Sequence, residues 1–158
     1  MAGPTQVAIL ADDLIWATRL RSIVTVAGAE AQVASSAGGF AALLAEARAA
    51  IVDLSARRSD PFEAIAAATR AGVGVMAVGP HEDAAARRRA LAAGASRVLP
   101  YRRLATDGPS VIAAWLGLER PAPAAAPVAA RPAPAPGPVA SAPVAWAPAS
   151  VGASEVDS

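Results

Sequence analysis

Short apolar runs alternate with amphipathic stretches along residues 1–118. The runs predict strands at 7–11, 31–34, 50–54, 73–78 and 97–99, and the first of them has the pattern of a strand buried on both faces of a parallel sheet. Apolar residues then recur at helical spacing, which predicts helices over about 14–28, 40–47, 61–72, 82–93 and from Pro109 onward. Ten alternating elements favour a doubly wound α/β domain.

Several residues mark the ends and faces of the predicted helices. Asp60 precedes Pro61, which predicts an N-cap followed by a first-turn proline. Gly28, Gly72 and Gly94 predict helix ends. Apolar or inward positions are expected in the first helix and in the last one at Leu14, Ile15, Thr18, Ile23, Val26, Ile112, Trp115 and Leu116.

The composition changes after Leu118. Nine of the fourteen prolines lie within 119–158, too closely spaced for a helix interior or a central strand. We therefore expect a folded α/β domain at 1–118 and a disordered, partly polyproline II tail rich in proline and alanine at 119–158. Trp146 lies in this tail, where it is either a docking anchor for a partner or a residue carried neutrally in a linker.

Several classes of site are excluded by composition. The chain has no cysteine and a single histidine, His81, so disulfides, thiolate metal sites and histidine clusters are absent. All fourteen basic residues are arginine, and the net charge of +1 points to neither nucleic acid nor a membrane surface. The apolar run at 7–11 is far shorter than a signal sequence or a membrane span, so we expect a cytoplasmic protein.

Acidic residues follow two of the predicted strands. Asp12 and Asp13 come after the first strand, and Asp53 lies at the end of the third. In a flavodoxin-like sheet of order 2-1-3-4-5 these strands are neighbours, and sites form beyond their carboxyl ends. Three converging carboxylates predict a site for a hard divalent cation, Mg²⁺ in the first place or Mn²⁺. A cap on the following helix is the alternative for Asp12.

The acidic residues belong to a set of motifs that resembles a known family. Asp12-Asp13 after the first strand, the run Ile-Val-Asp-Leu ending the third, and Ala-Leu-Ala-Ala-Gly-Ala before the fifth resemble response-regulator receiver domains over about residues 6–118. The resemblance implies that Asp53 is the phospho-acceptor, that Asp13 is a direct metal ligand and that Asp12 is an acidic partner acting through water. The Ser55 carbonyl would be a further ligand.

Two positions depart from the receiver pattern. Gly79 stands where a receiver has serine or threonine at the end of the fourth strand. Pro100 or Tyr101 stands where it has a lysine at the end of the fifth, and Arg102 is the nearest cation. An arginine differs from lysine in shape and length and is no equivalent point charge. The resemblance is therefore to a degenerate receiver.

Arginines mark a possible interaction face. Arg87–Arg89 are expected on the solvent face of their helix, and with Arg97, Arg102 and Arg103 they could contact an acidic partner. No DNA-reading motif accompanies them, so binding to nucleic acid is not expected. We retain Arg102, Arg103 and Trp146 as candidates for contact with a protein.

Three functions are compatible with the sequence. The first is a non-enzymatic signalling or protein-interaction module, a degenerate receiver without the switch hydroxyl and lysine. The second is a working receiver of a two-component system, in which a histidine kinase supplies the phosphoryl group to Asp53 with Mg²⁺. The third, a small-ligand or nucleotide-binding domain, is disfavoured because no glycine-rich phosphate loop follows the first strand.

Overall fold

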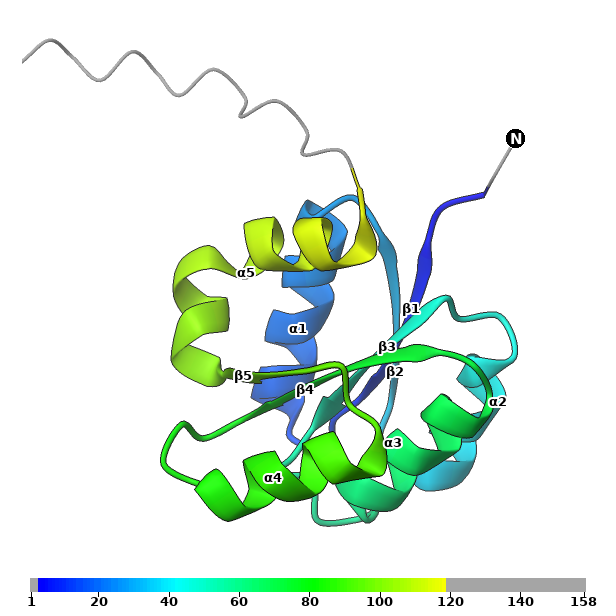
Figure 1. Ribbon diagram of the computed structural model, residues 1–158. Coiled ribbons are helices and arrows are strands. Elements are labelled where there is room, and N and C mark those ends of the chain that lie inside the picture. Colours follow the sequence, from blue (N-terminus) through cyan, green and yellow to red (C-terminus); the bar gives the residue numbers. More distant parts are fainter. Residues whose placement is uncertain (1–2, 119–158) are drawn as a thin grey trace, which may run out of the picture. The chain divides into compact units, whose positions relative to one another are not determined.

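The computed structural model describes residues 3–118 and contains a five-stranded sheet with helices on both faces (Figure 1). All strand pairs are parallel, and the order β2-β1-β3-β4-β5 confirms the flavodoxin-like α/β fold predicted from the sequence. Strands and helices alternate along the chain as β1 (Gln6–Leu10), α1 (Leu14–Val26), β2 (Glu30–Ala34), α2 (Ala37–Leu44), β3 (Ala49–Asp53), α3 (Pro61–Arg70), β4 (Gly74–Gly79), α4 (Ala84–Ala93), β5 (Arg97–Pro100) and α5 (Tyr101–Leu116).

Two apolar clusters hold the three layers together. Helices α1 and α5 lie on one face of the sheet, and α2, α3 and α4 lie on the other (Figure 1). Successive side chains of a strand point to opposite faces, so Val7 and Ile9 of β1 join the α1–α5 cluster while Ala8 and Leu10 join the other. Burial on both faces explains the continuous apolar sequences of the central strands β1, β3 and β4, whereas the edge strands β2 and β5 are largely exposed or half-buried.

The local signals for α3 and α4 act as predicted. The Asp60 side chain accepts a hydrogen bond from the Phe62 amide at 2.9 Å, and Pro61 occupies the first turn. Gly94 ends α4 with φ +117°, a conformation that glycine adopts without the steric cost of a Cβ. The N-cap of α4 is Asp83, which accepts from the Ala86 amide at 2.8 Å.

The start predicted for the last helix was wrong. Helix α5 begins at Tyr101, eight residues before Pro109, and contains a kink at Asp107, where φ is −126° and ψ is 16°. A proline suits the first turn of a helix, and here it lies just after the kink, inside the longer element. The segment 101–106 was missed, although it buries Leu104.

The buried face of α1 also differs from the prediction. Leu14, Ile15 and Val26 are 80%, 66% and 60% exposed. The face against the sheet is formed instead by residues at i, i+3 and i+7, namely Ala17, Leu20 and Val24. Alanine is too weak a hydrophobic signal in an alanine-rich chain to reveal this face. No helix within residues 3–118 has the length and apolar character needed to cross a bilayer.

Candidate functional site

Strands β1 and β3 bring the predicted acidic residues to one edge of the sheet. The two strands pair directly, with Leu10 opposite Val52, so the residues that follow them lie at the same carboxyl end. Asp53 is the last residue of β3 and is fully buried. Asp12 and Asp13 follow β1 in the loop before α1.

Asp53 is enclosed by hydroxyl and amide donors of the protein. Its Oδ1 atom accepts hydrogen bonds from the Ser55 amide at 2.9 Å, from Ser55 Oγ at 2.8 Å and from the Tyr101 hydroxyl. The two hydroxyl oxygens lie 2.8 Å apart. Oδ2 is buried and has no hydrogen-bond partner among the described residues. One carboxylate oxygen is thus saturated, and the other is shielded from solvent.

The Tyr101 ring closes the site from the junction of β5 and α5. It stacks on Trp16 of α1, with ring centroids 4.0 Å apart and an interplanar angle of 22°. Burial, together with donation to Asp53, raises the pKa of Tyr101 well above that of a free phenol. The phenol therefore stays protonated at neutral pH and remains a hydrogen-bond donor to the carboxylate.

The other two acids have separate partners. Asp12 Oδ2 accepts from the backbone amides of Arg57 and Arg58 at 2.6 and 2.8 Å, and these bonds, that to Arg58 foremost, lower its pKa. Asp13 Oδ1 caps α1 by accepting from the amides of Ile15 and Trp16. Capping, considered for Asp12 from the sequence, is thus performed by Asp13.

The three carboxylates do not form a ready ligand set for a metal. Within residues 3–118, no group of three acidic, histidine or cysteine side chains is arranged to hold a metal ion. The arrangement explains this, because Asp12 faces the loop after β3, Asp13 faces the helix it caps, and Asp53 faces Ser55 and Tyr101. The residues as placed therefore do not fit the Mg²⁺ predicted from the sequence, and binding would need side chains to turn.

An apolar side chain fills the space beside Gly79 at the end of β4. A Cβ at this position would lie 3.1 Å from Leu54 Cβ and 3.2 Å from Leu54 Cδ1. These distances are tighter than ordinary contacts, so a serine or threonine there would require Leu54 to shift. Leu54 is thus the apolar side chain that borders Gly79, the position where the receiver pattern has a hydroxyl.

The remaining sequence candidates lie outside this enclosure. Arg102 and Arg103 are exposed in the first turn of α5, and Arg103 pairs with Asp107 at 3.5 Å. His81 is exposed in the loop before α4. Trp146 lies outside the described residues, so its role in docking stays a prediction.

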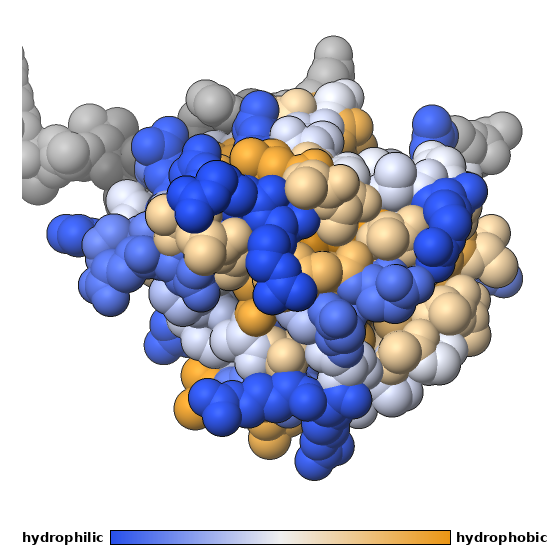
Figure 2. Space-filling model, turned by 60° about the horizontal axis from the view of Figure 1, so that its bottom comes forward, coloured by the Kyte–Doolittle hydropathy of each residue, from blue (hydrophilic) through white to orange (hydrophobic). Residues whose placement is uncertain are grey.

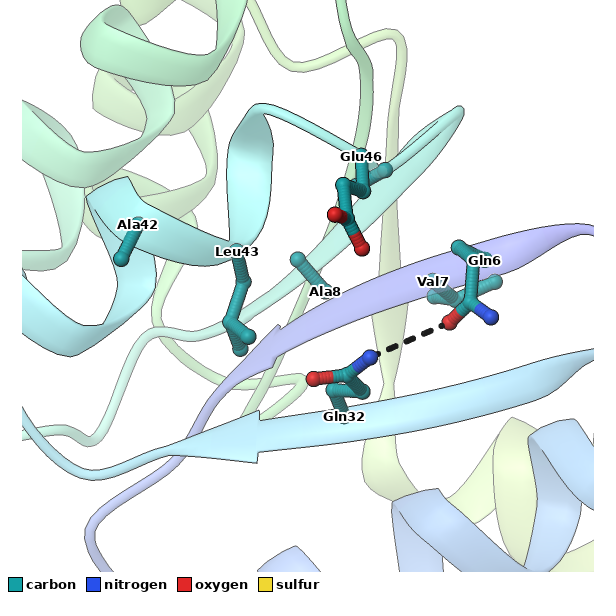
Figure 3. Close-up of a pocket in the computed structure, with 8 residues that line it drawn as sticks. Gln6, Val7, Ala8, Gln32, Ala42, Leu43 and Glu46 are labelled. Atoms are coloured by element: carbon teal, nitrogen blue, oxygen red, sulfur yellow. Dashed lines mark hydrogen bonds between the residues drawn. The ribbon is translucent and has the colours of Figure 1, made fainter.

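A separate hollow of about 190 Å³ lies toward the amino ends of β1 and β2 (Figure 3). Gln32 Nε2 donates to Gln6 Oε1 at 3.4 Å, and Gln6 Nε2 donates to Glu30. Leu43 of α2 and Glu46 just after it also line the hollow. The glutamines are engaged with their neighbours, and the hollow is remote from the carboxyl ends of the strands, so we assign no chemistry to it.

The titration of Tyr101 tests the enclosure, because it is the only tyrosine of the chain. A raised pKa means that the protonated phenol stabilises the fold below the ordinary value of about 10, and that this contribution is lost as pH rises through the folded value. We expect phenolate absorbance to appear only above pH 10, together with alkaline unfolding. In Asp53→Asn, phenolate should appear at lower pH, and an ordinary titration in the wild type would contradict the hydrogen bond.

Similar structures support the family resemblance at the level of the fold. A response regulator receiver protein from Burkholderia phymatum is 24% identical, with a TM-score of 0.64 over 74% of this chain and 98% of its own. A receiver domain from Clostridium thermocellum is 15% identical, with a TM-score of 0.62 over 72% of this chain and 94% of its own. A CheY-like receiver domain from Methanospirillum hungatei JF-1 is 19% identical, with a TM-score of 0.58 over 73% of this chain and 98% of its own.

Sequence comparison alone does not reach these proteins. Neither a family model nor a curated protein sequence matches the chain. The structural matches, in contrast, span nearly the whole length of the receiver domains named above. Residues 3–118 therefore have the fold of response-regulator receiver domains, as the acidic pattern and the ten alternating elements had predicted.

Proposed function

We propose that this chain is a non-enzymatic signalling module of the receiver fold, which binds a protein partner without control by an ordinary phosphorylation switch. The observation that carries the proposal is the enclosure of Asp53 by Tyr101 and Ser55. Asp53 is the residue that the receiver resemblance places as phospho-acceptor, and it is fully buried. Its side chain accepts hydrogen bonds from within the protein and is not turned outward toward a phosphoryl donor.

Access to the carboxylate supports this function. Transfer of a phosphoryl group to an aspartate requires one carboxylate oxygen to reach the phosphorus atom in line with the leaving oxygen. Oδ1 is occupied by three donors, and Oδ2 is buried. The Tyr101 ring must leave Trp16 before a donor can approach, and the stacking and the hydrogen bond both oppose that movement.

The groups that would recognise a phosphorylated Asp53 are also missing. The chain has no lysine, and Gly79 with Leu54 replaces the hydroxyl at the end of β4. An acyl phosphate would thus lose two hydrogen bonds, each worth on the order of 1–3 kcal/mol. A ligand that lacks differential contacts with two states cannot shift their populations.

A working phospho-accepting receiver is the second candidate. It is favoured by the position of Asp53 at the end of β3 beside β1, and by the Oδ2 atom, which lacks a partner among the described residues. A histidine kinase would then supply the phosphoryl group, with Mg²⁺ bound after Asp12 or Asp13 has turned from its present amides. The two candidates predict opposite responses to small phosphoryl donors.

The test is to incubate the full chain with Mg²⁺ and acetyl phosphate and to measure the intact mass. We expect no stable phosphoryl adduct in the wild type, the same result as in Asp53→Asn. Beryllofluoride, a mimic of the bound phosphoryl group, should leave the tryptophan emission unchanged, since Trp16, one of the three tryptophans, stacks on Tyr101 and reports its movement. Stoichiometric labelling that disappears in Asp53→Asn would establish the second candidate instead.

A further inference from the structure

A groove runs between helices α1 and α5, which lie side by side on one face of the sheet (Figure 1). Its volume is about 370 Å³, which lies in the range of sites that hold small molecules. The lining is mostly apolar and includes Trp16, Arg19, Ile23 and Val26 of α1 and Leu104 and Ala105 of α5. The groove is separate from the enclosure of Asp53, but the Trp16 ring borders both.

Two close contacts between α1 and α5 fix the width of the groove. Trp16 stacks on Tyr101, with the ring centroids 4.0 Å apart. Further along α1, Ile23 lies against Gly108 of α5, where an added Cβ would come within 2.7 Å of Ile23 Cγ2. Because the two helices already touch at Gly108, α5 cannot move closer to α1 without overlap. The groove is therefore a preformed feature of the packed helices.

The apolar lining can be reached by a ligand. Leu104 is almost fully buried beneath the groove, Trp16 and Ile23 are half-buried, and Val26 is 60% exposed. Apolar side chains also reach the surface elsewhere, as the orange areas among blue side chains in Figure 2 show. The groove between α1 and α5 differs from such scattered exposure because it combines a hollow of molecular size with an aromatic wall and one charged group.

That charged group is Arg19. Its guanidinium lies over the Trp16 ring, 5.4 Å from the centroid, and within residues 3–118 no carboxylate lies within 4 Å of it. A guanidinium presents a fixed fork of donors that matches a carboxylate. A second copy of the chain is a poorer match, because a two-fold interface would pair this lining with itself, and the lining has no acidic side chain among the described residues.

We propose that the groove between α1 and α5 binds a small carboxylic acid with an apolar body, its carboxylate on Arg19 and its body against Trp16, Ile23 and Leu104. The inference goes beyond the proposed function and stands apart from it, because the groove does not include the residues that bond to Asp53. The bound molecule would also contact the ring stack that closes over Asp53, through Trp16.

The experiment titrates cinnamate, a flat aromatic carboxylate, into the isotope-labelled full chain and follows the amide and indole signals by NMR. We expect saturable shifts at Trp16, Ile23 and Leu104, while the indole signal of Trp115 stays in place. Cinnamamide keeps the shape but not the charge, so it should bind about fivefold more weakly. In Arg19→Gln the two compounds should bind equally.

Matched variants test the location of the site. Ala105→Phe places a ring in the groove from an exposed position and should abolish binding. Ala114→Phe, at a position that is exposed on α5 but outside the lining, should bind as the wild type does. Arg21→Gln, on the same helix as Arg19 and also outside the lining, should retain the preference for cinnamate. Thermal melting confirms that each variant is folded.

Three results would overturn the site: no saturable shifts in the wild type, shifts centred on Trp115, or equal loss of the cinnamate preference in Arg21→Gln and Arg19→Gln. A dimer that Ala105→Phe dissociates in sedimentation would also overturn it, because a second copy would then cover the groove. None of these results alters whether Asp53 accepts a phosphoryl group, so the proposed function would survive them. Conversely, stable phosphorylation of Asp53 would refute the proposed function even if cinnamate bound.

Discussion

Replacement of Tyr101 by phenylalanine is expected to lower the free energy of unfolding by about 2 kcal/mol. The substitution keeps the ring that stacks on Trp16 and removes only the hydroxyl that donates to Asp53. Asp53 is fully buried, and loss of a donor leaves its carboxylate less well compensated in a medium of low dielectric constant. Equilibrium denaturation in urea measures the change.

A double-mutant cycle separates the hydrogen bond from other effects of the substitution. In an Asp53→Ala background the acceptor is gone, so Tyr101→Phe should cost little, and the coupling free energy should approach the cost of the single change. Ser55→Ala is a useful comparison, because the Ser55 amide remains to donate to Asp53. If Tyr101→Phe left the free energy of unfolding of the wild type unchanged, the hydrogen bond from Tyr101 to Asp53 would not contribute to stability.

Replacement of Gly94 by alanine is expected to cost about 3 kcal/mol. The residue has φ +117°, which disfavours any side chain, and the new Cβ would lie 2.4 Å from Thr69 Oγ1 and 2.8 Å from Thr69 Cγ2. Thr69 has little freedom to withdraw, because its hydroxyl donates to the Ile65 carbonyl at 2.9 Å. Strain and overlap therefore act together at the junction of α3 and α4.

Gly28 supplies the matched control for the backbone contribution. Its φ is +95°, but a Cβ there would meet no atom within 4 Å. Gly28→Ala should thus show the conformational cost alone, about 1 kcal/mol. Thermal or urea unfolding of both variants gives the comparison. Equal destabilisation would mean that Thr69 yields easily, and a smaller loss in Gly94→Ala combined with Thr69→Ala would confirm that the overlap is the cause.

The fold could be predicted because its signals are local and repeated. The central strands β1, β3 and β4 are apolar runs buried on both faces, and Asp60 and Gly94 mark helix ends by mechanisms that need no tertiary contact. The face of α1 could not be predicted in the same way. Its buried positions include Ala17, whereas the larger Leu14 and Ile15 are exposed in the first turn. There the larger side chains are exposed and a small one is buried, so the spacing of large apolar residues predicts the wrong face of α1 as buried.

The position of the candidate site could be predicted, but its state could not. The carboxyl ends of β1 and β3 had to meet once the strand order was known, which placed Asp53 near Asp12. The partner of Asp53 is Tyr101, 48 residues further along the chain. Tyr101 reaches Asp53 because α5 begins at Tyr101, whereas the sequence pattern placed the start of this helix near Pro109. A lone tyrosine directly after the last strand was the signal available.

Helix α4 is attached to the domain by little apolar surface, and this governs how the native state fluctuates. Ala90 is its single buried side chain, whereas α3 buries Pro61, Ala64, Ile65 and Ala68. Helices that bury little open locally at a lower free energy than the whole domain unfolds. The backbone amides of α4 should therefore exchange with solvent deuterium through such partial opening, whereas those of β1 and β3 should exchange only through global unfolding.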